Sequence, residues 1–261
     1  MSGYFEGTTP DIGLGDHVIG SAEPAGDQIV LDAADMLGTI ITSHGGVQVV
    51  TITAYCERDS LGDAEWWASQ KLEALAISEA GEIGFEDSAG RQVALAGALF
   101  VRGSAIVHAL TMAQMELEFI APVASADPAF GSAPAEPGTY GGRTSDEDYE
   151  ANSVSLGYGP VLQIAVDRQA QLRVVPRTLG SKAAGDPRGA VMALDITTDL
   201  VSDTDHWQVQ MEDKWRSIGA AKMNVTGNGN TWSNCVLDSI RPEPTDVYAT
   251  TLRYSFKREM S

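Results

Sequence analysis

Residues 47–56 read VQVVTITAYC, and residues 64–75 read AEWWASQKLEAL. The first segment is rich in β-branched residues and predicts a strand, whereas the second has apolar residues at positions i, i+4, i+8 and i+11 and predicts a helix. Ser60, with an acidic residue three positions later, supplies a capping box just before this helix. The same succession recurs later, with AVMALDIT at residues 190–197 and WQVQMEDKWRSI at residues 207–218. The sequence therefore predicts a strand–helix unit that occurs twice.

The rest of each unit aligns when Trp67 is set against Trp207. Each predicted helix is followed by a hairpin, and the second hairpin has Asn-Gly at residues 228–229, a pair that favours a tight primed turn. Each unit then ends in a strand of alternating apolar residues, which runs to Phe119 in the first unit and to Phe256 in the second. We therefore expect a mainly β (α+β) protein with two tandem β-barrel or β-sandwich domains, each with one packed α-helix.

A segment of different composition separates the two units. Residues 121–150 are rich in Pro, Gly, Ala and acidic residues and have no apolar periodicity, so we interpret them as a linker or long loop. The sequence predicts a first β domain over residues 1–120, with a helix near 63–78. It predicts a second β domain over residues 151–261, with a helix near 205–219.

The chain is strongly acidic. It has 261 residues with 17 Lys and Arg against 36 Asp and Glu, a net charge of −19. A field of that sign disfavours a surface that binds nucleic acid or anionic lipid. The charge is also uneven: residues 1–120 carry 4 basic and 18 acidic side chains, while residues 151–261 carry 12 of each. We therefore expect the two units to occupy different electrostatic surroundings.

The sequence offers no candidate catalytic residue, cofactor-binding residue or metal ligand. It lacks a Gly-x-Ser-x-Gly elbow and a phosphate-binding glycine loop, and its four histidines do not have metal-binding spacing. Cys56 and Cys235 are too few for a disulfide framework and indicate a reducing cytoplasm during assembly. No run of about 20 apolar residues predicts a membrane span, so we expect no membrane partner.

Polar residues on the last strand of each unit are the candidate functional positions. Aligning the two strands places Gln114, Glu116 and Glu118 at the positions of Thr251, Arg253 and the serine that follows two residues later. All of them lie on the face of the strand opposite its apolar residues. A solvated surface explains this pattern, and so does a face that lines a subunit boundary or a channel.

The pattern of the two units resembles the tail-tube fold of tailed bacteriophages. That fold occurs in tail-tube proteins and in distal-tail and baseplate-hub proteins. The resemblance is carried by the Leu-Gly…Gly-strand segments at 37–56 and 179–197, by the two Trp-bearing helices and by the terminal strands. It covers both units and leaves out the segment between them.

The resemblance implies a non-enzymatic virion structural protein that forms rings around a lumen through which DNA passes. Six folds per ring imply a trimer with pseudo-sixfold symmetry or a hexamer, located in the virion tail after assembly in the host cytoplasm. Its partners would be further copies of the chain and other tail or baseplate proteins, with no cofactor. The loops 38–46 and 180–189 would then contact successive rings, and their candidate residues are His44, Gly45, Gly46, Gly185 and Asp186.

Two alternatives stay open. The first is a distal-tail or baseplate-hub ring protein of the same fold, which would stop after one ring and bind other proteins. The second belongs to another class, a carbohydrate-binding β module. Such a module would stack sugars on Trp66, Trp67 or Trp232.

Overall fold

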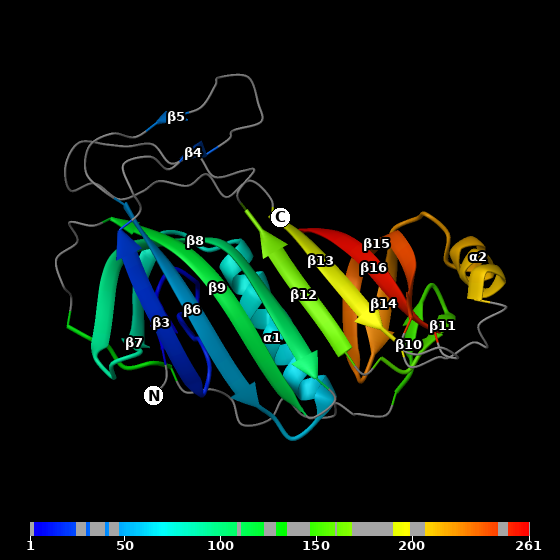
Figure 1. The fold of residues 1–261 in the computed structure, drawn as a ribbon, viewed down its shortest axis with the longest axis horizontal. Helices are drawn as coiled ribbons and strands as arrows, with labels where there is room; N and C mark the ends of the chain where they lie inside the picture. Colours follow the sequence, from blue (N-terminus) through cyan, green and yellow to red (C-terminus); the bar gives the residue numbers. More distant parts are fainter. Residues whose placement is uncertain are drawn as a thin grey trace.

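The protein is built mainly of β-strands, as Figure 1 shows for the computed structural model. The structure is 60% strand and 16% helical, so the predicted mainly β class is confirmed. The structure describes residues 3–24, 30–31, 40–41, 47–108, 111–122, 129–134, 147–159, 161–168, 190–198, 207–244 and 250–260.

The elements follow one another in two similar series. The first series is β1 (Tyr4–Phe5), β2 (Ile12–Gly13), β3 (His17–Pro24), β4 (Val30–Leu31), β5 (Ile40–Ile41), β6 (Val47–Glu57), α1 (Leu61–Ala76), β7 (Gly81–Asp87), β8 (Gln92–His108) and β9 (Met112–Pro122). The second series is β10 (Tyr149–Ala151), β11 (Val154–Gly157), β12 (Val161–Asp167), β13 (Ala190–Thr197), α2 (Trp207–Ile218), β14 (Met223–Gly227), β15 (Asn230–Pro244) and β16 (Thr250–Met260).

All of these strands except the small β4–β5 pair belong to one 14-stranded sheet. In the first series the strands lie side by side in the order β3-β6-β9-β8-β7-β1-β2. In the second series the order is β12-β13-β16-β15-β14-β10-β11, so each strand has a counterpart in the same place. The two series join where β8 pairs antiparallel with β12, from Arg102 opposite Asp167 to His108 opposite Val161. The sheet is therefore continuous through both halves of the chain.

The two halves differ in how the sheet closes. In the first half, β3 pairs parallel with β7 at Ile19 and Gly20, which closes a ring of five strands, β3-β6-β9-β8-β7. In the second half the counterpart of β3 is β12, and its outer edge is occupied by β8. Among the described residues only the first half therefore closes as a barrel, where the sequence predicted a β-barrel or β-sandwich in each half.

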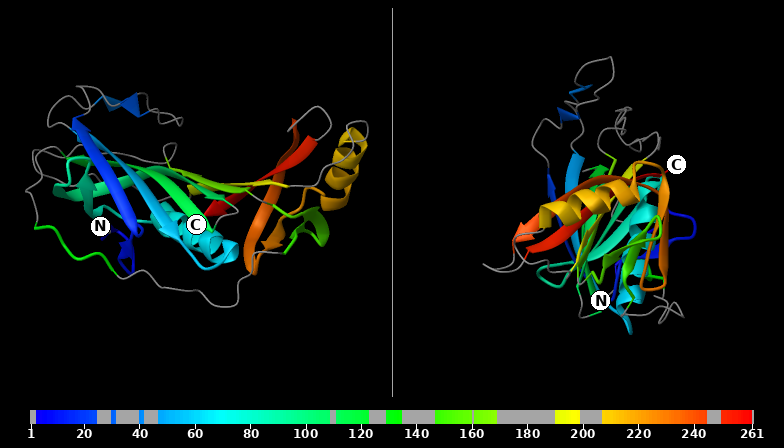
Figure 2. Two further views of the ribbon diagram at one scale, coloured as in Figure 1. Left: turned by 60° about the horizontal axis from the view of Figure 1, so that its bottom comes forward. Right: turned by 90° about the vertical axis from the view of Figure 1, so that its right-hand side faces the viewer.

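The helix α1 is stabilised by a hydrogen-bonded cap at its start and by burial of its apolar face. The Ser60 side chain accepts a hydrogen bond from the Asp63 amide at 3.1 Å, as the capping pattern predicts. Trp67, Leu72 and Leu75, spaced along one face, are completely buried. The helix lies against one face of the sheet and packs on β8, β9, β12 and β15 (Figure 2). It therefore covers strands of both halves.

The helix α2 is in a different situation at the far end of the molecule (Figures 1 and 2). Of its residues only Ile218 is buried, and it packs only at its own end of the sheet, on β15 and β11. The prediction of a packed helix in each half is right for α1. The helix α2 also packs on the sheet, through Ile218 and the half-buried Met211, but most of its surface is exposed. The physical reason for the difference is that α1 also lies against β12 and β15 of the second half, whereas the main contacts of α2 are with β15 and β11 of its own half.

The strands alternate between the core and a polar face, as predicted. In β9 the residues Met115, Leu117 and Phe119 are buried, and the glutamates between them lie on the other face. The β14–β15 turn has positive φ at Asn228 (48°) and Gly229 (77°), which confirms the predicted primed turn. The buried side chains form one main cluster that extends through both halves.

Part of the predicted linker packs on the first half. The strand β9 extends to Pro122 and β10 begins at Tyr149, so both ends of the predicted range 121–150 lie in strands. Between them the Phe130 ring meets the Tyr4 ring edge-on, with centroids 5.4 Å apart. The Gly131 amide donates to the Tyr4 hydroxyl at 2.8 Å.

Candidate functional site

The junction between the two halves is held by polar contacts of α1 with the second half. The Asn230 side-chain amide donates to the Gly62 carbonyl at 2.8 Å and to Glu65 at 3.3 Å. One turn further on, the Trp232 indole N–H donates to the Ser69 hydroxyl at 3.0 Å. These partners lie more than 160 residues apart in the sequence. The first turns of α1 are therefore attached to the β14–β15 hairpin of the other half.

Glu65 is the centre of this attachment. Its side chain is completely buried, accepts from the Tyr149 hydroxyl, and accepts from the Asn228 amide at 3.2 Å. Burial raises the pKa of Glu65 to about 7, although the hydrogen bonds from Tyr149, Asn228 and Asn230 oppose this shift. The Tyr149 ring in turn stacks on Trp232, with centroids 6.3 Å apart and planes within 19°. This group of hydrogen-bonded side chains, the polar lock, connects α1 of the first half to the second half.

The C-terminal end of α1 is held by two arginines of the second half. Arg168 is buried and donates to the Leu75 carbonyl at 3.2 Å and to the Ser78 carbonyl at 3.0 Å, two acceptors at the end of the helix. Burial lowers the pKa of Arg168 from its usual value. The Arg258 guanidinium pairs with Glu73 at 2.8 Å. Both ends of α1 are thus fixed to the second half.

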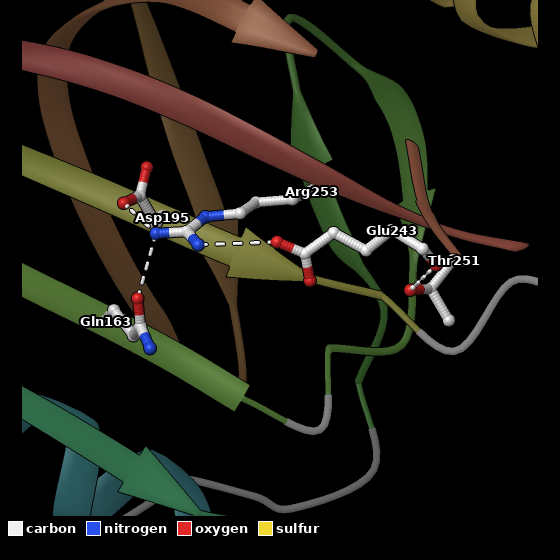
Figure 3. A network of polar contacts seen from close by, with 5 residues as sticks. All are labelled: Gln163, Asp195, Glu243, Thr251 and Arg253. Atoms are coloured by element: carbon white, nitrogen blue, oxygen red, sulfur yellow. Dashed lines mark hydrogen bonds and ion pairs between the residues drawn. The ribbon is translucent and has the colours of Figure 1, made fainter. Parts of the chain in front are cut away.

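A second polar site lies on the opposite face of the sheet, around Arg253 of β16 (Figure 3). One guanidinium nitrogen donates to Asp195 at 2.6 Å and to Gln163 at 2.9 Å, and another donates to Glu243 at 3.3 Å. These residues come from β13, β12 and β15, so one arginine links four neighbouring strands. The hydrogen bond with Asp195 raises the pKa of Arg253. Its charge is neutralised within the sheet face.

The other predicted positions lie on the same polar face, and two of them, Glu118 and Thr251, have partners there. Glu118 pairs with Arg102 of the neighbouring strand at 2.7 Å. Glu116 is exposed, and Gln114 is half-buried two residues before it. Thr251 is largely buried, and its hydroxyl donates to the Glu243 carbonyl at 3.1 Å.

Glu116 and Arg253 occupy matching places in the two halves, and three strands lie between β9 and β16 in the sheet. The structure therefore does not bring Glu116 and Arg253 into contact within one chain. The predicted loop residues His44, Gly45, Gly46, Gly185 and Asp186 lie outside the described residues.

Several important residues were missed by the sequence analysis. Asp195 interrupts the apolar run of β13, which is the one signal that could have marked it as a polar-face residue. Glu65, Asn228 and Asn230 gave no such signal, because their significance depends on the packing of α1 against the second half. Of the tryptophans considered for sugar stacking, Trp67 and Trp232 are buried and present no ring face to solvent.

Two further observations concern the described part of the chain. In it, no group of three or more His, Cys, Asp or Glu side chains is arranged to hold a metal ion. Neither described helix has the length and apolar character needed to cross a membrane.

These features define a mainly β protein with one continuous sheet, in which the same strand order occurs twice. Comparison with known proteins adds no family to this description. No protein-family profile covers the sequence, and no curated protein matches it.

Proposed function

We propose that this chain is a non-enzymatic structural subunit of a bacteriophage virion. Its two halves are tandem tail-tube-like domains, and several copies form a ring of the tail around a lumen through which DNA passes. Such a subunit would be assembled in the host cytoplasm and would contact further copies of itself and other tail or baseplate proteins. These partners are the ones implied by the resemblance to the tail-tube fold described above.

The observation that carries this proposal is the junction between β8 and β12. It joins two units of identical strand order edge to edge, in a head-to-tail manner. A contact of this kind repeats from unit to unit, and it produces a closed ring if the rotation between units closes. Ring closure also removes the exposed sheet edges that each chain has at its ends. Three chains with two units each give six units per ring.

The polar face of the sheet supports the assignment of a lumen. On this face Arg253 and Arg102 are paired with carboxylates, while Glu116 is exposed. The chain as a whole has a net charge of −19. A wall on which Arg253 and Arg102 are paired and Glu116 is exposed, in a chain of net charge −19, would repel DNA phosphates, so that DNA could pass without binding.

A baseplate-hub ring of the same fold remains the closest alternative, since it uses the same ring contact. The carbohydrate-binding alternative is weakened by the burial of Trp67 and Trp232, because a sugar-stacking ring must be accessible to its ligand.

Negative-stain electron microscopy of the purified protein tests the proposal. The experiment is done at physiological salt, where the Debye length of about 8 Å limits repulsion between the acidic chains. We expect rings or tubes with a central hole, and class averages with threefold or sixfold symmetry give the number of chains. Stacked tubes support a tail tube, and single rings support a baseplate position. Monomers alone, at every concentration tested, would contradict the ring.

A further inference from the structure

We infer that α2 and the adjacent outer edge of β15 form the surface on which the first half of a second copy docks. This inference rests on the proposed function, and it names the residues through which one chain meets the next. The partner is another copy of this chain, because within one chain the corresponding surface of the first half, formed by α1 and β8, is already occupied by the second half.

The helices α1 and α2 differ in how well their equivalent sides are covered. When Trp67 is aligned with Trp207, Ser69 of α1 corresponds to Val209 of α2, and Ala76 corresponds to Arg216. Ser69 is only 3% exposed, where it contacts the second half through Trp232. Val209, at the same position of α2, is 58% exposed. The side of α2 that would face a following unit is therefore uncovered.

The same side of α2 carries further exposed residues. Glu73 pairs with Arg258 of the second half, whereas its counterpart Asp213 has a side chain that is 68% exposed. The Arg216 side chain is 74% exposed, where Ala76 of α1 is buried. Within the described part of the chain, these positions of α2 are thus exposed, where the equivalent positions of α1 are buried or paired with the second half.

In the described part of the chain, the outer edge of β15 is open where the matching edge of β8 pairs with β12. The part of β8 that pairs with β12 begins at Arg102, which pairs with Glu118 of β9. The matching pair in the second half is Ser239 with Ser255. In β15 the segment from Ser239 to Pro244 pairs with β16 on one side and has no strand on its other side among the described residues. The counterpart of the β8–β12 junction is therefore an open edge.

This edge adjoins α2. A shallow groove of about 230 Å³ lies between them, lined by Met211, Trp215 and Ile240 together with Glu212 and Arg216. The exposed side of α2 and the open edge of β15 thus form one continuous surface. It is the arrangement that α1 and β8 have at the junction within the chain.

The strand that this edge would meet is β3 of the second copy. A row of paired residues crosses the sheet in each half, and the two rows match: Ala22–Val50–Phe119 and Ile164–Leu194–Phe256. The strand β3 is therefore the counterpart of β12. Its pairing with β7 involves only Ile19 and Gly20, and the residues after Gly20 are not involved in that pairing.

The register of the docked strands follows from the same correspondence. Ser104 pairs with Ala165 across the junction within the chain. The counterpart of Ser104 is Arg241, and the counterpart of Ala165 is Glu23. Both side chains are exposed in the single chain. Docking therefore places a guanidinium of one copy opposite a carboxylate of the next, a favourable cross-strand pair.

The edge also limits how strongly it can bind through its backbone. Leu252 directs its carbonyl to Thr198 of the neighbouring segment, so its partner Pro242 directs its backbone polar atoms away from β16, toward the open edge. Pro242 and Pro244 have no N–H to donate there. The strand ladder between copies thus has fewer hydrogen bonds than the β8–β12 ladder, and contacts of α2 must contribute the rest.

The test uses two lysine variants of exposed valines in the full chain. Val209→Lys lies on the docking side of α2, and Val191→Lys is the matched control on β13, where Val191 is 40% exposed. Sedimentation velocity over a concentration series measures association, and circular dichroism confirms that each variant is folded. We expect Val209→Lys to weaken association roughly 100-fold, because a charge would have to be desolvated in the contact. We expect Val191→Lys to associate like the wild type.

A charge exchange tests the register separately. Arg241→Glu and Glu23→Arg are each expected to weaken association roughly tenfold, because like charges then face each other across the junction. The double variant restores the opposite charges and is expected to recover most of the wild-type association. Recovery cannot be explained by a merely structural role of either residue.

The outcomes separate the two proposals. A wild-type chain that assembles together with a Val209→Lys variant that assembles equally well overturns the docking surface and leaves the ring intact. A double variant no better than the weaker single variant overturns the register. A wild-type chain that is monomeric at every concentration contradicts the ring itself, and with it the contact between copies.

Discussion

Replacing Glu65 with glutamine tests whether the junction between the halves contains a buried carboxyl group that titrates near neutral pH. Glu65 is completely buried, and burial raises its pKa from 4.5 to about 7. The hydrogen bonds from its neighbours act in the opposite direction, and desolvation outweighs them. In the unfolded chain the same group is hydrated, so its pKa there is close to the ordinary value.

The sign and size of the effect follow from this difference in pKa. Between pH 4.5 and about 7 the folded protein keeps the proton on Glu65 and the unfolded chain loses it. The stability that this group contributes is therefore fully present below pH 4.5 and is lost as the pH rises to about 7. Each pKa unit corresponds to about 1.4 kcal/mol, so the loss amounts to about 3 kcal/mol.

Urea unfolding at several pH values measures this contribution. The experiment compares the wild type with Glu65→Gln at one low protein concentration, so that association does not add to the apparent stability. Glutamine does not titrate. We therefore expect the free energy of unfolding of the variant, minus that of the wild type, to increase by about 3 kcal/mol from about pH 5 to about pH 8. A constant offset from altered hydrogen bonding does not affect this change with pH.

Glu116→Gln provides the control, because Glu116 is exposed on the polar face. Its unfolding curve is expected to shift with pH in the same way as that of the wild type. If the Glu65→Gln curve also runs parallel to the wild type over the whole range, the carboxyl group is hydrated in the folded protein, and the account of the junction given above is refuted.

Four further substitutions test the packing of the junction and of the first half, each by urea unfolding. Trp232→Phe removes the hydrogen bond to Ser69 and is expected to cost about 1–2 kcal/mol, whereas Ser69→Ala alone costs less. Arg168→Ala leaves the carbonyls at the end of α1 without their donor and is expected to cost about 2–4 kcal/mol; a neutral result would mean that water replaces the guanidinium. Gly20→Ala would place a methyl group 2.4 Å from the Phe85 ring, and we expect a loss of about 1–3 kcal/mol, with no loss if β3 and β7 separate freely.

Much of the local structure could be predicted because it depends on neighbouring residues. The cap at Ser60 and the apolar spacing of α1 are properties of a few consecutive positions, and both are present in the structure. The alternation in β9 and the Asn-Gly turn at 228–229 are of the same kind. Periodicity therefore identified these elements and the order in which they recur.

The contacts that hold the two halves together could not be predicted in this way. Glu65 and Asn230 are 165 residues apart in the sequence, and neither has a local pattern that names the other. The same is true of Arg168 and the end of α1. Likewise, no pattern in β12 indicates that its outer edge pairs with β8 of the first half and not with a strand of its own half. Edge pairing depends on which strand lies nearby in the fold. The polar lock and the arginine network on the sheet face are therefore known only from the structure.

The difference between α1 and α2 has a physical explanation in how the two contacts are formed. The halves of one chain are linked covalently, so their junction forms at a high effective concentration and can tolerate groups that are costly to bury, such as Glu65 and Arg168. A junction between separate copies must form at the concentration of free protein and has no such advantage. Exposed residues such as Val209 and Arg241 are then better suited, because they remain hydrated in the free chain. Under the proposed docking, the prolines on the β15 edge fit the same reasoning: they disfavour strand addition alone, so a second copy would dock only where α2 also makes contacts.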